Sequence, residues 1–439
     1  MFKTLKQALK VKDIRKGLIY TFLMLIIVRI GCQLPLPGTN SDAIKEITNQ
    51  FSSGAFGFFD AMTGGSFSQM SVFALNITPY ITSSIIMQLL TIAIPKLEEI
   101  QKDGEDGRKK IQKVTRIMSV FLAALEATAM AIGFGRRGLF GTDTSGWKYT
   151  SVIIVAVIAM TAGATLLMWM GERITEKGVG NGISIILLIN IVSRMPSDII
   201  GLYEKFVGGA SSVGGSALAA VVIAAVIIIV VAFVVLLNDG VRKVPVQYSK
   251  KMQGRKAMGG QSSFIPVKVN IANVIPVIFA QSILQFPVVI ASFFGHGQDG
   301  WTKYLTTTYW CNPDNLKYSI GFVVYILLVV FFAYFYTSIT FNPIEVADNM
   351  KKQGGFIPGI RPGKPTSEYL QTILNYVVFV GAIGLIIVCV IPILMSGIFS
   401  ADVSFGGTSL IIIVGVILET MKTIESKMVV RNYKGFLLD

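Results

Sequence analysis

The chain contains 439 residues, of which 52% are hydrophobic and only 15% are charged, whereas a soluble globular chain carries about 25% charged residues. Its net charge is nevertheless +14, from 39 Lys and Arg against 25 Asp and Glu. This combination excludes a disordered protein, a secreted disulfide scaffold and an ordinary cytosolic enzyme, and it fits a membrane protein whose charges are confined to loops outside the bilayer.

Long apolar runs predict the main elements in chain order. A helix needs about 20 apolar residues to cross the hydrocarbon core, whereas the strands of a membrane β-barrel would be short and of alternating polarity. The clearest run, residues 217–237, contains no charged residue. The sequence therefore predicts an all-α membrane protein with ten transmembrane helices, at residues 17–34, 71–94, 117–134, 151–170, 181–195, 215–237, 271–293, 318–340, 369–395 and 406–423.

Basic residues are unevenly divided between the two sides of these spans. The loops on the side of the N-terminus hold 30 Lys and Arg and those on the other side hold 8, with Arg29 inside the first span. Because positive residues stay cytoplasmic, both termini are predicted to be cytoplasmic. No small-x-small cleavage site follows the first apolar run, so residues 1–16 are interpreted as a basic amphipathic helix and not as part of a signal peptide.

Few polar features lie inside the spans. Arg29 is near the outer end of the first span, where we favour an interfacial anchor whose side chain snorkels to the surface. Glu126 is the only deeply placed carboxylate, and it suits either a transport site or a helix–helix hydrogen bond. Residues 51–70 are apolar and aromatic but too short to cross, which suits an interfacial loop or a re-entrant element.

Two pairs of aliphatic residues share helix faces. Ile81 with Ile85, and Ile183 with Leu187, are spaced four residues apart and therefore lie on one side of a helix. In a membrane protein such pairs most often face lipid or pack against a neighbouring helix.

Two loops on the basic side are longer than topology requires. Residues 238–270 carry seven cations against one acid, and residues 342–368 also mix cations with Gly and Pro turns. Loops longer than about 15 residues tend to be functional. The tip at residues 254–256, Gly-Arg-Lys, suits phosphate contacts on nucleic acid and equally an acidic protein surface.

The sequence offers no site for an enzyme. It has a single histidine, His296, and its three cysteines at 32, 311 and 389 form no metal-binding spacing. The run GVGNG lacks the GxxxxGK[ST] pattern of a phosphate loop. We therefore predict no catalytic residue, no metal and no cofactor.

Several long motifs resemble the SecY family of protein-translocation channels. They are PVQYSKKMQGRK followed by IPVKVNIANVIPVIFAQSILQFP, together with NITPYITSSIIMQLLT, ERITEKGVGNGISIILL, FNPIEVADNMKKQGGFIPGIRPGKPT and GGTSLIII. They occur in order in both halves of the chain, so the resemblance covers essentially its whole length.

The resemblance implies an architecture. Two inverted five-helix halves, here residues 17–212 and 213–423, surround an hourglass pore and hinge between the fifth and sixth helices. The N-terminal helix 1–16 and a C-terminal tail, 424–439, lie in the cytoplasm. A lateral gate between helices two and three and helices seven and eight opens towards lipid.

The resemblance also assigns roles to residues. Six aliphatic side chains match the pore constriction, with Leu187 in place of the usual Ile: Ile81, Ile85, Ile183, Leu187, Ile278 and Ile412. The plug that fills the outer funnel matches Phe56, Gly57, Phe58, Phe59, Asp60, Ala61, Met62, Thr63, Gly64 and Gly65. The lateral gate matches Gln88, Glu126, Asn273 and Phe286. The docking surface for a motor or ribosome matches Lys250, Lys251, Arg255, Lys256 and Arg361.

The implied function is a polypeptide channel in the bacterial cytoplasmic membrane, driven by the SecA ATPase or by a ribosome. Its implied partners are the small membrane subunits SecE and SecG, signal sequences and nascent chains, besides anionic lipids. With this resemblance we favour an interhelical hydrogen bond for Glu126. The alternative is an ion-coupled transporter of a small molecule, which the shortage of buried charge disfavours.

Overall fold

The computed structural model describes residues 6, 8–40, 44, 60, 63–136, 138–140, 146–204, 213–248, 252–253, 256–257, 262–293, 300–311, 313–399 and 407–435. Each of the ten predicted spans corresponds to one long helix. These helices are α2 (Lys12–Cys32), α5 (Thr78–Ala93), α7 (Glu105–Gly135), α8 (Trp147–Lys177), α9 (Gly182–Leu202), α10 (Val213–Asp239), α11 (Ile275–Phe293), α13 (Ile320–Thr340), α15 (Lys364–Phe399) and α16 (Gly407–Gly435).

These helices differ in whether they are long and apolar enough to cross a membrane. Within the described ranges, six are long and apolar enough to cross a membrane, and α5 qualifies when joined to α6 (Pro95–Lys102), from which it is bent by 108°. The bend follows from Pro95, because a proline in a helix lacks the amide hydrogen that would continue the hydrogen-bond ladder. α2 is less apolar because it contains Arg15 and Lys16 besides Arg29. α16 is less apolar because Glu419 and Lys422 follow its apolar half.

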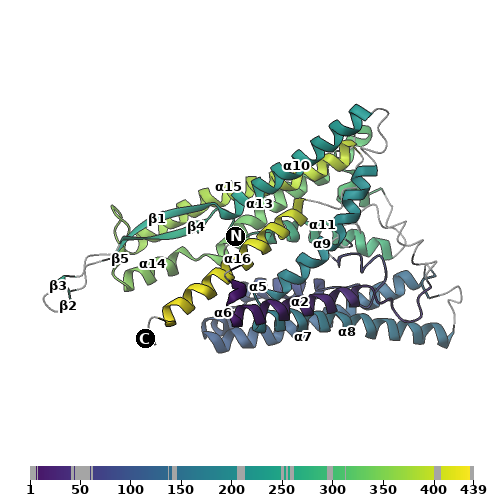
Figure 1. Ribbon diagram of the computed structural model, residues 1–439, viewed down its shortest axis with the longest axis horizontal. Helices are drawn as coiled ribbons and strands as arrows, with labels where there is room; N and C mark the ends of the chain where they lie inside the picture. Colours follow the sequence, from purple (N-terminus) through teal and green to yellow (C-terminus); the bar gives the residue numbers. More distant parts are fainter. Residues whose placement is uncertain are drawn as a thin grey trace.

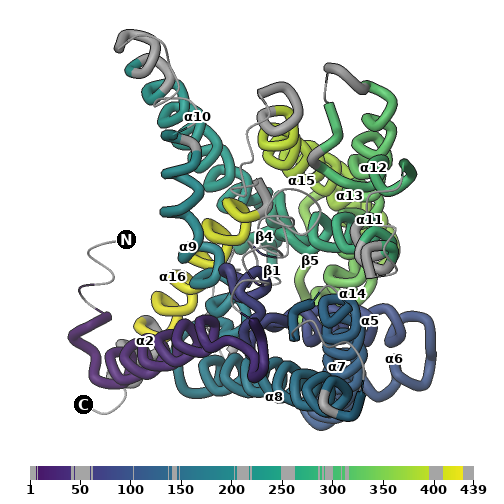
Figure 2. The backbone as a smooth tube through the Cα atoms, turned by 90° about the vertical axis from the view of Figure 1, so that its right-hand side faces the viewer, coloured from purple at the N-terminus to yellow at the C-terminus, as the bar shows by residue number. Residues whose placement is uncertain are grey.

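The long helices form two groups in chain order. Figure 1 shows α2, α7 and α8 lying along one side and α10, α13 and α15 along the other. α9 from the first group packs against α16 from the second, and α7 contacts α11. Figure 2 shows α16 beside α9 and α10. The two groups therefore meet along two helix pairs, α9 with α16 and α7 with α11.

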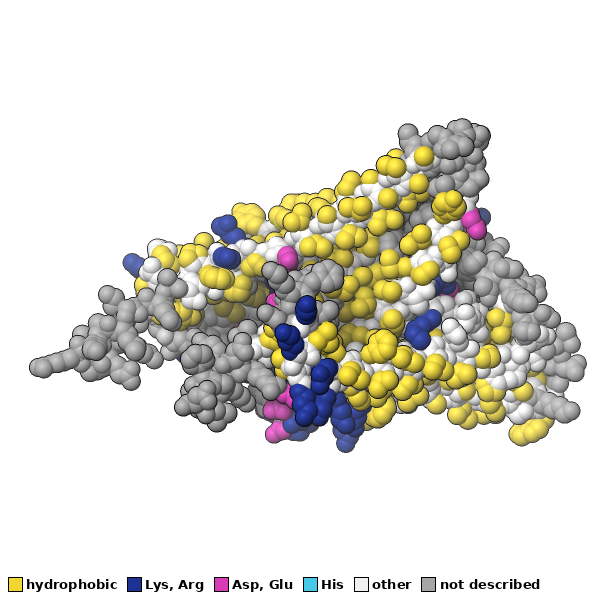
Figure 3. All heavy atoms as spheres, viewed as in Figure 1, with side chains coloured by type: hydrophobic (Ala, Val, Ile, Leu, Met, Phe, Trp, Pro, Cys, Tyr) yellow, Lys and Arg dark blue, Asp and Glu magenta, His cyan; other side chains and the backbone are white. Residues whose placement is uncertain are grey.

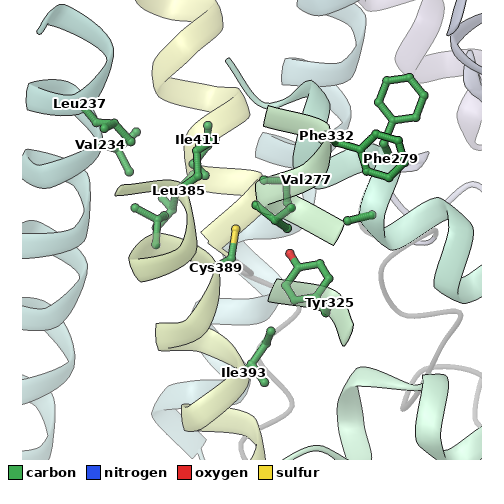
Figure 4. Close-up of a cluster of buried hydrophobic side chains, with 14 of the residues drawn as sticks. Val234, Leu237, Val277, Phe279, Tyr325, Phe332, Leu385, Cys389, Ile393 and Ile411 are labelled. Atoms are coloured by element: carbon green, nitrogen blue, oxygen red, sulfur yellow. The ribbon is translucent and has the colours of Figure 1, made fainter. Parts of the chain in front are cut away.

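The second group has its own apolar core. Figure 4 shows Tyr325, Cys389 and Ile411 among the buried side chains that α10, α11, α13, α15 and α16 contribute. The rings of Phe279 and Phe332 stack with their centroids 5.1 Å apart. This packing joins α11 to α13.

A short segment closes one end of this core. It contains α12 (Thr302–Leu305) and the two 3₁₀ turns η2 (Thr307–Tyr309) and η3 (Pro313–Ser319). Trp310 between them is fully buried, and its indole Nε1 donates a hydrogen bond to the carbonyl of Tyr304 at 2.8 Å. The sequence suggested no role for residues 294–317, and the described part anchors this end of the second group.

The loop at 238–270 contains a β-ribbon that the sequence analysis did not predict. Its strands β1 (Val241–Tyr248) and β4 (Ser262–Lys268) pair antiparallel, and the short strands β2 (Met252–Gln253) and β3 (Lys256–Ala257) pair further along. Strand β5 (Gly355–Phe356), from the loop at 342–368, pairs with the end of β1. The two long basic loops thus share one sheet of order β4-β1-β5.

The sheet is fixed to the helices by its buried face. Val244 and Val246 point the same way because strand residues alternate between faces, and both are buried. They join an apolar cluster with Met350 of α14 (Pro343–Lys352) and Leu370 of α15. Both basic loops are therefore packed on the helices as one body.

The outer surface of the helices is apolar. Large hydrophobic side chains are exposed on α2, α7, α8, α10 and α13, with Phe22, Phe121 and Ile228 among the most exposed. Figure 3 shows hydrophobic side chains as a broad band across the visible face, while the largest group of Lys and Arg side chains lies at its lower edge. Apolar surface of this extent needs lipid around it, so the chain is a multi-pass membrane protein.

Candidate functional site

Aliphatic side chains from both helix groups meet in one buried cluster. Its members among the residues matched to a pore constriction are Ile81, Ile183, Leu187, Ile278 and Ile412. They come from α5, α9, α11 and α16. The structure therefore brings together five side chains that are up to about 330 positions apart in the sequence.

The burial of these side chains differs between the helices. Ile278 is 9% exposed and Ile412 is 3% exposed, while Ile81 and Ile183 are partly buried. The sixth residue, Ile85, lies one turn along α5 and packs against the core of the second group instead. It too makes contact across the boundary between the two groups.

The run GVGNG positions α9 next to α8 and α2. Asn181 caps α9 by accepting hydrogen bonds from the amides of Ile183 and Ser184, which satisfies two free donors at the helix start. A side chain at Gly182 would collide with the carbonyl of Gly171, and one at Gly178 with the Thr21 hydroxyl. The glycines therefore allow close backbone approach, which places Ile183 and Leu187 in the aliphatic cluster.

Part of the predicted plug lies outside the described residues, namely 56–59, 61 and 62. Its described members pack as tight turns. Thr63 donates a hydrogen bond to the carbonyl of Asp60, and Ser66 donates to the carbonyls of Thr63 and Phe73. Gly64 and Gly65 have φ of +68° and +86°, a region where glycine is favoured. This turn includes the last residues of the segment matched to the plug, and the chain continues from it towards α5.

The interpretation of Arg29 as an interfacial anchor is wrong. Its guanidinium Nη1 lies 3.4 Å from the carbonyl of Gly64 and 3.4 Å from Oδ1 of Asn190. The side chain therefore points into the protein, where a charged group can be stabilised by polar partners. Neither Asn190 nor Arg194 of α9 was identified from the sequence, yet Arg194 forms an ion pair with Asp60. The charge of Arg194 inside an apolar helix was the available signal.

The residues matched to a lateral gate lie on both sides of the boundary between the groups. Gln88 on α5 is exposed, and Glu126 on α7 is half-buried. Asn273 precedes α11 with a φ of +54°, and its buried Oδ1 has no hydrogen-bond partner among the described residues. In this conformation Asn273 Oδ1 is therefore not bonded to Glu126. Phe286 belongs to α11, but its side chain is not among those that the structure describes.

The residues matched to a docking surface are described only in part. Lys250, Lys251 and Arg255 lie outside the described residues, and Lys256 is described only as the backbone of β3. Arg361 is exposed, and its carbonyl accepts a hydrogen bond of 2.8 Å from Thr366 Oγ1.

Two flanking glycines shape the backbone on either side of Arg361. Gly359 and Gly363 have φ of +83° and +110°, values that favour glycine over residues with a Cβ. The exposed guanidinium of Arg361 is therefore presented from a backbone of defined shape.

Across the described ranges, no three His, Cys, Asp or Glu side chains gather in a way that could hold a metal ion. The polar groups of the site are single residues spread over several helices.

A profile of the SecY family matches residues 71–421 of the chain. The chain belongs to the SecY family. The protein translocase subunit SecY of Streptomyces galbus is 42% identical over 448 residues, and that of Halalkalibacterium halodurans is 41% identical over 447 residues, each comparison covering 100% of both chains. The SecY relative from Corynebacterium glutamicum is 42% identical, with 98% of this chain and 99% of its own covered.

Solved structures share the fold. The structure described as a protein conducting channel aligns with a TM-score of 0.65 at 19% identity, over 95% of this chain and 93% of that chain. The canine Sec61 channel in its complex with a ribosome aligns with a TM-score of 0.61 at 18% identity, again over 95% and 93%. The fold is thus that of SecY and Sec61 channels, which have ten helices in two halves.

Proposed function

We propose that this chain is the protein-conducting channel of a bacterial Sec translocase. It passes unfolded secretory polypeptides across the cytoplasmic membrane and releases transmembrane segments sideways into lipid. The observation that carries the proposal is the aliphatic cluster where α5, α9, α11 and α16 meet, in a chain of the SecY family. The two halves of the proposed channel are residues 17–212 and 213–423.

The proposed constriction consists of Ile81, Ile85, Ile183, Leu187, Ile278 and Ile412. Flexible aliphatic side chains fit around a passing chain of any sequence, and an apolar constriction resists wetting by water and ions. Leu187 replaces Ile without a change of volume, which cores tolerate well. In the conformation described here, five of these side chains pack against one another, so it corresponds to a closed channel.

The proposed lateral gate runs between α5 with α7 on one side and α11 with α13 on the other. α7 and α11 are in contact, which corresponds to a closed gate. Gln88, Glu126, Asn273 and Phe286 are its proposed residues. A hydrogen bond between membrane helices is worth about 0.6–2 kcal/mol, which suits a contact that breaks in each cycle. For Glu126 we keep the role of an interhelical hydrogen-bond partner.

The cytoplasmic docking surface is formed by the two long basic loops, with Lys250, Lys251, Arg255, Lys256 and Arg361 as its proposed contacts. The sheet that joins the loops supports this role, because both then face a partner as one body. Related channels are described in complexes with ribosomes, the canine Sec61 channel and the yeast Ssh1 complex. We infer that a ribosome or the SecA motor docks here, that SecE and SecG complete the channel, and that anionic lipid contacts the basic loops.

Energy for transport comes from the docked partner in this proposal. The described residues contain no metal cluster, and the sequence has no phosphate loop. Plug residues 56–65 are proposed to fill the outer funnel at rest. Both termini are proposed to be cytoplasmic, because 30 of the 39 cations lie on their side of the spans.

Reconstitution tests the proposal. The chain is placed in liposomes with its small subunits, and import of a secretory precursor is measured with and without SecA and ATP. We expect precursor that is protected from added protease only when SecA and ATP are both present. Import without a motor, or the ion-coupled uptake of a small solute by the same vesicles, would contradict the proposal.

A further inference from the structure

One buried ion pair connects the plug segment to the wall of the first half. The carboxylate of Asp60, through Oδ2, pairs with the guanidinium Nη1 of Arg194 on α9. The side chain of Asp60 is 5% exposed and that of Arg194 is 23% exposed. Because Asp60 is buried and Arg194 is only partly exposed, removal of one partner leaves the other charge unpaired in a largely buried site, which is destabilising.

Asp60 also organises its own segment. Its Oδ1 accepts a hydrogen bond of 2.8 Å from the amide of Ser68, and its carbonyl accepts hydrogen bonds from the amide of Gly65 and the hydroxyl of Thr63. The carboxylate thus has one oxygen on the local turn and the other on Arg194. Separation of Asp60 from Arg194 therefore requires that the whole turn moves away from α9.

A second attachment lies one turn back along α9. Arg29 of α2 contacts both the carbonyl of Gly64 and Asn190 Oδ1, and the thiol of Cys32 lies 3.9 Å from the same Oδ1. An added Cβ on Gly64 would lie 2.8 Å from the backbone oxygen of Asn190 and 2.7 Å from Arg29 Nη1. This close fit fixes the position of the turn, so the Asp60 carboxylate is directed at Arg194.

Arg194 has an alternative partner. Asp198 lies four residues further along α9. Residues spaced i and i+4 on a helix are neighbours. Arg194 would therefore retain a carboxylate partner after Asp60 departs, which lowers the cost of breaking the first pair.

We propose that the Asp60–Arg194 ion pair is a latch that holds the plug segment in the resting channel, and that its strength sets how readily an incoming signal sequence opens the channel. Asp60 and Arg194 are positioning residues in this account, since neither needs to touch the translocating chain. The proposal rests on the proposed function of the chain as a polypeptide channel.

The test uses the channel with its small subunits in planar bilayers and in liposomes. We expect Asp60→Asn and Arg194→Gln each to raise resting ion conductance about tenfold and to permit import of a precursor with a defective signal sequence. Arg194→Lys keeps the charge and should stay close to the parent. The double variant D60R/R194D restores opposite charges and should recover part of the lost closure, with a clear departure from additivity.

Two controls separate this proposal from others. Glu105→Gln removes an exposed ion pair with Lys109 and should change neither measurement. Import of a normal precursor by the parent channel checks the proposed function itself. In one outcome, the parent channel imports the normal precursor while Asp60→Asn and Arg194→Gln show the same resting conductance as the parent and the same rejection of a defective signal sequence. That result refutes the latch and leaves the channel function in place. Equal loss in Arg194→Gln and Arg194→Lys would also overturn it, since that result indicates packing and not charge.

Discussion

The substitution Ile278→Asn tests whether the aliphatic cluster closes the pore. Ile278 is 9% exposed and is surrounded by aliphatic side chains of α5, α9 and α16. An amide buried there without a partner costs about 1–3 kcal/mol on the scale of protein mutational data. In an open, hydrated pore the same amide is solvated and this cost disappears, so the substitution destabilises the closed state selectively.

The magnitude follows from this difference. A shift of 1–3 kcal/mol changes a two-state equilibrium by about 5- to 150-fold. We therefore expect the resting conductance of Ile278→Asn, measured in planar bilayers with the assembled channel, to rise at least about fivefold. Precursors with weak signal sequences should also be imported more readily.

Two further variants identify the cause of any leak. Ile278→Leu conserves volume and should behave as the parent. Val329→Asn places the same amide in the core of the second half, away from the pore, so it should lower thermal stability without a leak. Parent conductance in correctly assembled Ile278→Asn, or an equal leak in Val329→Asn, would refute the reasoning.

Three further predictions concern other parts of the chain. Arg361→Glu should reduce SecA-dependent import about tenfold, because a carboxylate replaces the exposed cation of the proposed docking surface. The control Lys303→Glu, in the segment between α11 and α13, should leave import unchanged. Unchanged import by Arg361→Glu would show that Arg361 does not take part in docking. Gly182→Ala should lower the free energy of unfolding by about 1–3 kcal/mol, because the methyl group of the introduced alanine would collide with the carbonyl of Gly171. Thermal denaturation in detergent measures this change. An unchanged midpoint would show that α8 and α9 can move apart without loss of stability. Burial raises the pKa of the Cys311 thiol, so less thiolate is present at a given pH. Maleimide labelling of Cys311 should therefore be slower than labelling of an exposed cysteine, and its rate should rise only above the ordinary thiol pKa. A labelling rate that rises around the ordinary thiol pKa would contradict this prediction.

The ten spans could be predicted because each contains a long apolar run, and the described helices match all ten. Their ends could not be predicted as well. α7 begins at Glu105 and α8 continues to Lys177, since both helices extend past the apolar run into polar sequence. Hydropathy reports the thickness of the hydrocarbon and not the length of the helix.

The β-ribbon was missed because a proline lies inside each of its two longer strands, Pro245 in β1 and Pro266 in β4, and a proline counts against a strand. Val244 and Val246 lie on one face of β1, but the residue between them is Pro245, and the loop as a whole carries seven cations. Strand β5 contributes only two residues and pairs over a long distance in the chain. Such pairings depend on tertiary structure, which local patterns do not encode.

Arg29 shows a similar limit. Its partner Asn190 is distant in the sequence, and a cation near the end of a span reads equally well as a surface anchor. The aliphatic cluster was predicted from the family resemblance, since the i,i+4 spacing of Ile81 and Ile85 is equally expected for lipid contact. The structure adds that helices from both halves direct these residues to one place.

The three-stranded sheet has a consequence for the order of assembly. Strand β1 is synthesised more than a hundred residues before β5, and α11 and α13 lie between them in the chain. The sheet is therefore completed only after both helices have been made and brought back to the ribbon, a non-local step that is slow compared with local folding. A chain arrested before β5 would display the ribbon without the loop that carries Arg361. The complete three-stranded sheet thus becomes available late in biogenesis, when most of the second half is already in place.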